Sequence, residues 1–126
     1  MLLFDENISP VLVDFLAKCG APTKLQHLRK LGWSGKPDAD WIPRAIENGW
    51  VIVTADRNDA TRGFAVAQLK ALGVRMVWLG PFWDHLGRWE KAKWLVNHVE
   101  PIADATMLAE ASTVLLFNQI GPPRSI

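Results

Sequence analysis

Cysteine is nearly absent from this chain, which contains a single one, Cys19, among its 126 residues. One thiol excludes an internal disulfide and a cysteine-based zinc site. Because Cys19 follows the apolar spacing of a predicted helix over residues 9–20, we expect it to be a buried free thiol.

Long apolar runs and a surplus of either charge are also missing. No run approaches the roughly twenty residues of a transmembrane helix, and the first residues lack the basic start of a signal peptide. We therefore expect a cytoplasmic protein that does not enter a membrane. The net charge of +1 means that any nucleic-acid binding depends on a local basic patch. The length and the 49% apolar content predict one globular domain over residues 1–126, with a loose tail over residues 119–126.

Tyrosine is absent, whereas seven tryptophans are spread along the chain. A base-stacking platform needs neighbouring aromatic side chains on one exposed face. The spread therefore favours tryptophans that anchor the core and interfaces.

Strand-like and helix-like segments alternate along the sequence. Short apolar stretches lie at residues 2–5, 24–28, 50–56, 74–80 and 112–117, and the one at 50–56 is continuous and rich in β-branched residues. Segments with helical spacing and with Ser, Pro or Gly boundaries lie at residues 9–20, 38–49, 64–73 and 85–102. This alternation predicts an α/β domain with a mainly parallel central sheet of four to five strands.

Carboxylates follow two of these strands directly. Asp5 and Glu6 end the first, Asp56 ends the third, and Asp59 lies in the next turn, where it could simply bind turn backbone groups. Because parallel strands end at the same edge, we expect Asp5 and Asp56 to be neighbours. Carboxylates that converge repel one another unless a cation joins them, and oxygen ligands suit Mg²⁺ or Mn²⁺.

A second acidic pair, Asp38 and Asp40, opens the helix before the third strand. In a simple crossover we expect this helix start at the opposite end from Asp5, unless the preceding loop brings it round. Helix capping and the helix dipole are an alternative reason for acidic residues here. The three histidines are scattered and have no metal-ligand spacing.

Two phosphate-handling folds also place acidic residues after a first strand. A receiver domain needs a lysine after its last strand, and "LLFNQIGPP" has none. A haloacid-dehalogenase-type phosphatase needs a second Asp two residues after the first, where this chain has Asn7. No glycine-rich phosphate loop follows any strand.

Three stretches, "LLFDENISPVLVDFL", "LGWSGKPDADWI" and "GWVIVTADRN", together resemble the PIN-like proteins. More narrowly they resemble the compact VapC-type toxin branch, in which "DEN" opens the chain and "T-x-D" closes the third strand. The later "ALGVRMVWLG" and "GRWEKAKWLV" are similar to that branch too. The resemblance implies a three-layer α/β/α sandwich and metal-dependent endoribonuclease chemistry with Mg²⁺ or Mn²⁺.

The resemblance also implies roles for single residues. Asp5, Asp38 and Asp56 match the acidic positions of the family and are the implied catalytic metal ligands. Glu6 accompanies Asp5, and Asp40 is a substitute or helper for Asp38.

A fourth carboxylate occurs in many relatives at a position where this chain has Asn58, and Asp59 is the nearest replacement. Arg57 and Arg62 are either phosphate contacts or solvated turn charges. The side chains expected to bind water or phosphate are Asn7, Thr54, Arg57, Asn58 and Arg62. A basic stretch that either extends the groove or stays a solvated loop contains Lys24, Arg29, Lys30 and Lys36.

The predicted function is thus cleavage of single-stranded or structured RNA by a toxin. Its expected partners are a cognate antitoxin, a small helix-turn-helix protein, and a second copy of the chain in a homodimer. The alternative is a catalytically weak PIN-like module that acts by binding RNA or antitoxin.

Overall fold

A six-stranded sheet forms the centre of the protein, whose structure, a computed structural model, describes residues 1–56 and 65–126. The strand order is β2-β1-β3-β4-β5-β6, with the first five parallel and β6 antiparallel to β5. All five predicted strands form, which confirms the mainly parallel α/β class. The strands are β1 (Leu2–Phe4), β2 (Leu25–His27), β3 (Val51–Thr54), β4 (Arg75–Leu79), β5 (Thr113–Phe117) and β6 (Arg124–Ser125).

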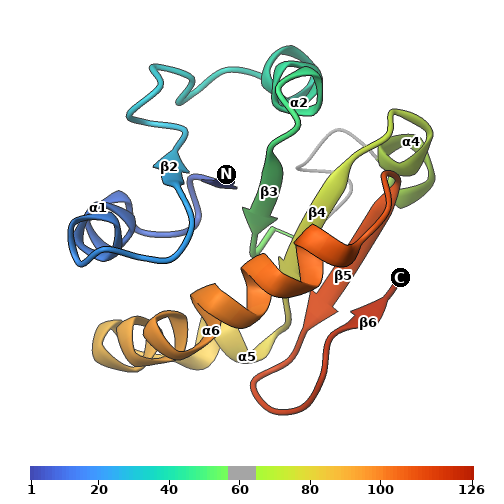
Figure 1. The fold of residues 1–126 in the computed structure, drawn as a ribbon. Coiled ribbons are helices and arrows are strands. Elements are labelled where there is room, and N and C mark those ends of the chain that lie inside the picture. The colour runs from blue at the N-terminus through green and yellow to red at the C-terminus, as the bar shows by residue number, and fades with distance from the viewer. Residues whose placement is uncertain (57–64) are drawn as a thin grey trace.

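Helices cover both faces of this sheet, so that the fold has three layers. They are α1 (Pro10–Lys18), α2 (Asp38–Glu47), α4 (Val66–Ala71), α5 (Phe82–His85) and α6 (Arg88–Leu108). On β4, Val77 and Leu79 face the core beneath α1, α5 and α6, whereas Met76 and Trp78 face the core beneath α2 and α4. In Figure 1, α6 crosses in front of β4 and β5. Successive side chains of β4 thus point to opposite faces of the sheet, as expected for a strand that is buried on both faces.

Local sequence signals explain where the helices begin. Ser9 caps α1 by accepting a hydrogen bond from the Leu12 backbone N–H at 3.3 Å, and Pro10 occupies the first helical position. The helix predicted over residues 85–102 begins only at Arg88, after the Gly87 cap, and continues to Leu108. No helix in the described parts of the chain is long and apolar enough to cross a bilayer.

Two sequence expectations differ from the structure. Cys19 is exposed, because α1 ends at Lys18 and buries the Val13 and Leu16 side of the helix, leaving Cys19 as its C-cap. Residues 119–126 are not wholly a loose tail, because Arg124 pairs with Leu116 of β5. An edge strand with unpaired backbone groups readily accepts such a partner.

Candidate functional site

The carboxyl edge of β1 and β3 brings acidic and polar side chains together. Phe4 pairs with Val53 in the parallel register, so Asp5, the first residue after β1, lies beside Thr54, the last residue of β3. The Asp5 backbone N–H donates to the Val53 carbonyl at 3.0 Å, which extends the ladder to the very end of the strands. The backbone therefore fixes the position from which the Asp5 carboxylate projects.

Thr54 is the centre of a hydrogen-bond network at this edge. Its hydroxyl donates to Asp5 Oδ2 at 3.0 Å and accepts from the Asp56 backbone N–H at 3.0 Å and from Asn7 Nδ2 at 3.4 Å. One donor and two acceptor positions are all that a hydroxyl has. Because Thr54 is only 1% exposed, it positions Asp5 and Asp56 and has no capacity left for the substrate contact expected from the sequence.

Asn7 closes the network from the other side. Its Oδ1 accepts a hydrogen bond from the Ala55 backbone N–H at 3.2 Å, while its Nδ2 reaches Thr54. The residue thus clamps the segment after β1 to the end of β3. Asn7 is itself exposed, and an amide nitrogen has two hydrogens, so that its outer face is available to a ligand.

The Asp5 carboxylate is in an unusual environment. Burial raises its pKa above the ordinary value of 3.8, and the nearby charges of Asp56 and Glu6 raise the pKa further. Hydrogen bonds from the Glu6 backbone N–H, at 2.6 Å, and from Thr54 oppose this rise by favouring the charged form. A nearby positive charge would therefore stabilise the ionised form of the Asp5 carboxylate.

Glu6 binds the loop that precedes α2 through its side chain. Its Oε1 accepts a hydrogen bond from the Gly35 backbone N–H at 2.6 Å. Asp38 follows Gly35 by three residues, which span at most about 11 Å. The expectation that Asp38 lies at the opposite end is therefore wrong. A helix that leads into a parallel strand runs antiparallel to it, and so begins at the carboxyl edge.

Within α2, Asp38 and Asp40 face different surroundings. Asp38 Oδ1 accepts a hydrogen bond from the indole N–H of the buried Trp41 at 3.1 Å. Asp40 is exposed and lines a small hollow with Lys36 and Arg44. Side chains two positions apart on a helix point about 200° apart, so the two carboxylates cannot act from one face. Both residues lie in the first turn, where the helix dipole favours them.

The carboxylate oxygen atoms at this edge suit a hard divalent cation as ligands. Within the described chain, the groups that donate hydrogen bonds to the Asp5 carboxylate are neutral, and the Asp56 charge adds to the unfavourable charge near it. Carboxylate oxygen atoms are the ligands that Mg²⁺ and Mn²⁺ prefer. Among the described residues, however, no group of three or more Asp, Glu, His or Cys side chains is arranged to hold a metal. The metal therefore stays a prediction, as does the part of Asp38 in it.

Part of the predicted site lies outside the described residues. The members concerned are Arg57, Asn58, Asp59 and Arg62.

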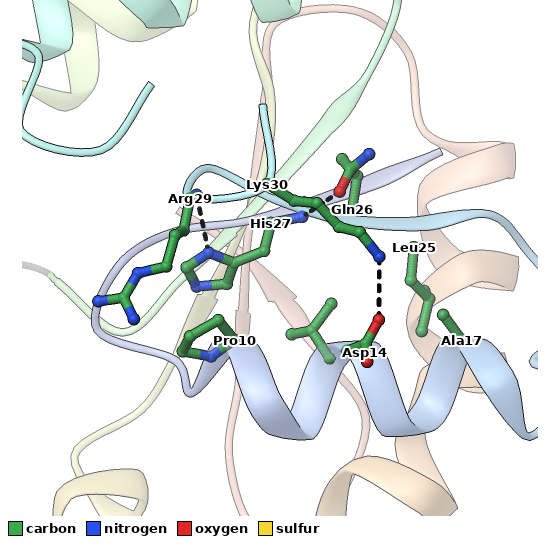
Figure 2. Close-up of a pocket in the computed structure, with 9 residues that line it drawn as sticks. Pro10, Asp14, Ala17, Leu25, Gln26, His27, Arg29 and Lys30 are labelled. Carbon is green, nitrogen blue, oxygen red and sulfur yellow. Dashed lines mark hydrogen bonds and ion pairs between the residues drawn. The ribbon is translucent and has the colours of Figure 1, made fainter. Parts of the chain in front are cut away.

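The predicted basic stretch is partly neutralised. Lys30 pairs with Asp14 at 3.0 Å, and Lys18 pairs with the same carboxylate at 2.9 Å. The Lys30–Asp14 pair borders a hollow between α1 and β2, drawn in Figure 2. In it, His27 Nδ1 accepts from the Arg29 backbone N–H at 3.0 Å, and Nε2 contacts the Ile8 carbonyl at 2.7 Å. His27 is therefore a buried histidine with a partner at both ring nitrogens.

Sequence reasoning missed one feature of this edge. The turn after β4 starts the two helices α5 and α6 on the same side as the acidic residues, with Arg88 and Lys91 in the first turn of α6. The signal was present, because any helix that follows a parallel strand begins at that strand's carboxyl end.

Comparison with known proteins gives one match. Residues 1–81 fit the family model described as a PIN like domain. That range includes β1 to β4 and every described residue of the Asp5–Thr54–Asp56 network. No curated protein and no solved structure match the chain.

Proposed function

Because the chain belongs to the PIN-like domain family, whose fold is generally that of nucleases, we propose that it is a metal-dependent endoribonuclease. The observation that carries the proposal is the Asp5–Thr54–Asp56 network. It holds a largely buried carboxylate of raised pKa beside a second carboxylate, and the hydrogen-bond donors to Asp5 in the described chain carry no charge. An arrangement of this kind is stabilised when a cation arrives.

In the proposal, Asp5 and Asp56 hold one Mg²⁺ or Mn²⁺, with Asp38 as a third ligand, partly through water. When bound, the metal polarises a phosphodiester and lowers the pKa of an attacking water. Thr54 keeps the two carboxylate-bearing segments in register, and Asn7 offers its free amide hydrogen to the phosphate or water. Glu6 holds the loop that presents Asp38.

The test is metal-dependent cleavage of a mixed RNA pool by the purified chain. We expect cleavage with Mg²⁺ or Mn²⁺, none with excess EDTA, and a loss of at least about a hundredfold in Asp5→Asn and in Asp56→Asn. Asp104→Asn is the matched control, because Asp104 is an exposed aspartate about 24 Å along α6 from Arg88. Equal cleavage by Asp5→Asn and Asp104→Asn would overturn the assignment.

We further propose that the nuclease is the toxin of a toxin–antitoxin pair. The similarity of the "DEN" and "T-x-D" motifs to the VapC-type branch supports this, and a small helix-turn-helix protein is the expected partner. A neighbouring gene that encodes such a protein, and its co-purification with the chain, would support the pairing. Growth unaffected by expression of the active chain alone would contradict it.

A second candidate is a PIN-like module that binds RNA or antitoxin with little turnover. The amide at Asn58, where many relatives have a carboxylate, is the observation that favours it. Tight RNA binding without cleavage, unchanged in Asp56→Asn, is the result that would select this candidate.

A further inference from the structure

A groove of about 650 Å³ opens at the carboxyl edge of the sheet, between α1 and the turn that joins α5 to α6. Its size lies within the roughly 300–1,000 Å³ of ordinary ligand sites. The helices that wall it, α1 after β1 and α5 and α6 after β4, all begin at the edge that carries Asp5. The groove is therefore on the same side of the molecule as the acidic network.

One wall of the groove is apolar and exposed. Val11 and Phe15 of α1 line it, with 77% and 56% of their surfaces exposed. Leaving a large aromatic side chain in water has no benefit for folding, because burial of such a side chain is favourable by about 1.5–3 kcal/mol. Phe15 thus offers a flat apolar surface that a ligand can cover.

The opposite wall is cationic. Arg88 and Lys91 of α6 line it, and the Lys91 ammonium lies 5.3 Å from the ring centroid of the buried Trp83, which holds the charge over the groove. Within the described chain, neither Arg88 nor Lys91 forms an ion pair with a carboxylate. Lys93, two residues further along α6, is by contrast paired with Glu90 at 3.2 Å.

The groove continues into the acidic network through one residue. Asn7 lines the groove and also binds Thr54 and the Ala55 backbone. A ligand that touches Asn7 from the groove is therefore one side chain away from Asp5. An aromatic surface combined with cations is the usual way in which proteins hold single-stranded nucleic acid.

We propose that this groove binds the nucleotide next to the cleaved phosphate of a single-stranded RNA. Its base covers Phe15, and its phosphate lies against Arg88 and Lys91. The identity of the ligand rests on the proposed function, whereas the groove and its charges do not. Duplex RNA keeps its bases stacked and unavailable to Phe15, so the groove selects single strands.

The test measures binding of a fluorescein-labelled single-stranded RNA in the uncleaving Asp5→Asn background, by fluorescence anisotropy. We expect Lys91→Ala to weaken binding about fivefold and to lower the salt slope by about 0.7, the value for one phosphate contact with a single strand. Phe15→Ala should weaken binding at least about fivefold with little change in the slope. An unlabelled duplex of the same sequence should compete poorly.

The controls are Lys93→Ala, a lysine of the same helix outside the groove, and Val96→Ala, an apolar residue 57% exposed on α6. Both should bind RNA as the parent does.

If Lys91→Ala and Phe15→Ala also bind RNA as the parent does, the proposal is wrong. A groove that binds an apolar peptide of a protein partner instead of RNA would give this result. If the wild type does not cleave RNA but Lys91→Ala and Phe15→Ala weaken RNA binding as expected, the groove binds RNA and the proposed nuclease function is wrong. If the wild type cleaves RNA and both variants bind RNA as the parent does, the nuclease function is supported and the proposed groove is wrong.

Discussion

The Thr54 hydroxyl donates a hydrogen bond to Asp5 Oδ2 at 3.0 Å, from a residue 49 positions away in the chain. This contact joins the ends of β1 and β3, and it favours the charged form of a carboxylate that burial disfavours. The same hydroxyl oxygen accepts the Asp56 backbone N–H. One small side chain therefore controls both the charge and the spacing of the candidate site.

Replacing Thr54 with valine keeps the shape of the side chain and removes the hydroxyl. We expect the free energy of unfolding to fall by about 1–3 kcal/mol, because the backbone N–H of Asp56 loses a buried acceptor. Loss of the hydrogen bond should also raise the pKa of Asp5 further. Urea unfolding followed by tryptophan fluorescence measures the first effect. Thr54→Ser retains the hydroxyl and should recover most of the stability; a serine variant as unstable as the valine one would contradict the role given to the hydroxyl.

The stability of the metal-free protein should depend on pH through two aspartates with opposite signs. Burial raises the pKa of Asp5 above 3.8, so the folded state binds its proton more tightly than the unfolded state does. Its contribution is present below 3.8 and is lost as the pH rises through the raised pKa. Lys18 and Lys30 lower the pKa of Asp14, so its contribution is present above 3.8 and is lost as the pH falls through the lowered pKa.

Unfolding curves in EDTA from about pH 3 to about pH 7 separate the two effects. Relative to the wild type, Asp5→Asn should gain stability as the pH rises from 3.8 through the raised pKa of Asp5. Asp14→Asn should lose stability relative to the wild type as the pH rises from the lowered pKa of Asp14 to 3.8. Parallel pH profiles for both variants would show that the two carboxylates do not differ in environment.

Glu6 should control the mobility of the loop before α2. Its carboxylate accepts the Gly35 backbone N–H at 2.6 Å. Glu6→Ala removes this acceptor, so we expect amide hydrogen exchange at Gly35 to accelerate about fivefold to tenfold. Gly73, which donates to the Lys70 carbonyl at 3.0 Å far along the chain, is the internal control. Equal protection of Gly35 in the variant and the wild type would mean that Glu6 does not anchor the loop.

Two neighbouring tryptophans should respond differently to replacement by phenylalanine. Trp94 Nε1 donates to the Gln119 carbonyl at 3.2 Å, whereas the buried Trp83 Nε1 has no hydrogen-bond partner among the described residues. Both changes remove a similar ring volume, but only Trp94→Phe loses a hydrogen bond. We expect Trp94→Phe to be the less stable variant by about 1 kcal/mol in urea unfolding. The opposite order would indicate that Trp83 Nε1 has an acceptor in solution.

The order of strands and helices and one half of the candidate site follow from local sequence signals. Short apolar runs and helix boundaries are local signals, so they were enough to place the five parallel strands. Their alternation with helices then required parallel pairing, and parallel pairing puts Asp5 and Asp56 at one edge. The side of Asp38 was also within reach, since it follows from the direction of a crossover helix, but the expectation of the opposite end was wrong.

Which side chains meet and which surfaces stay open depends on how distant segments pack together. Three features join segments that are far apart in the chain. They are the hydrogen bond from Thr54 to Asp5, the hydrogen bond from the Gly35 backbone to Glu6, and the groove between Phe15 and Lys91. Helical spacing marked Cys19 as a residue of the apolar face, yet its side chain is exposed. Periodicity describes one helix alone, whereas the covered face is set by the neighbours that pack against it.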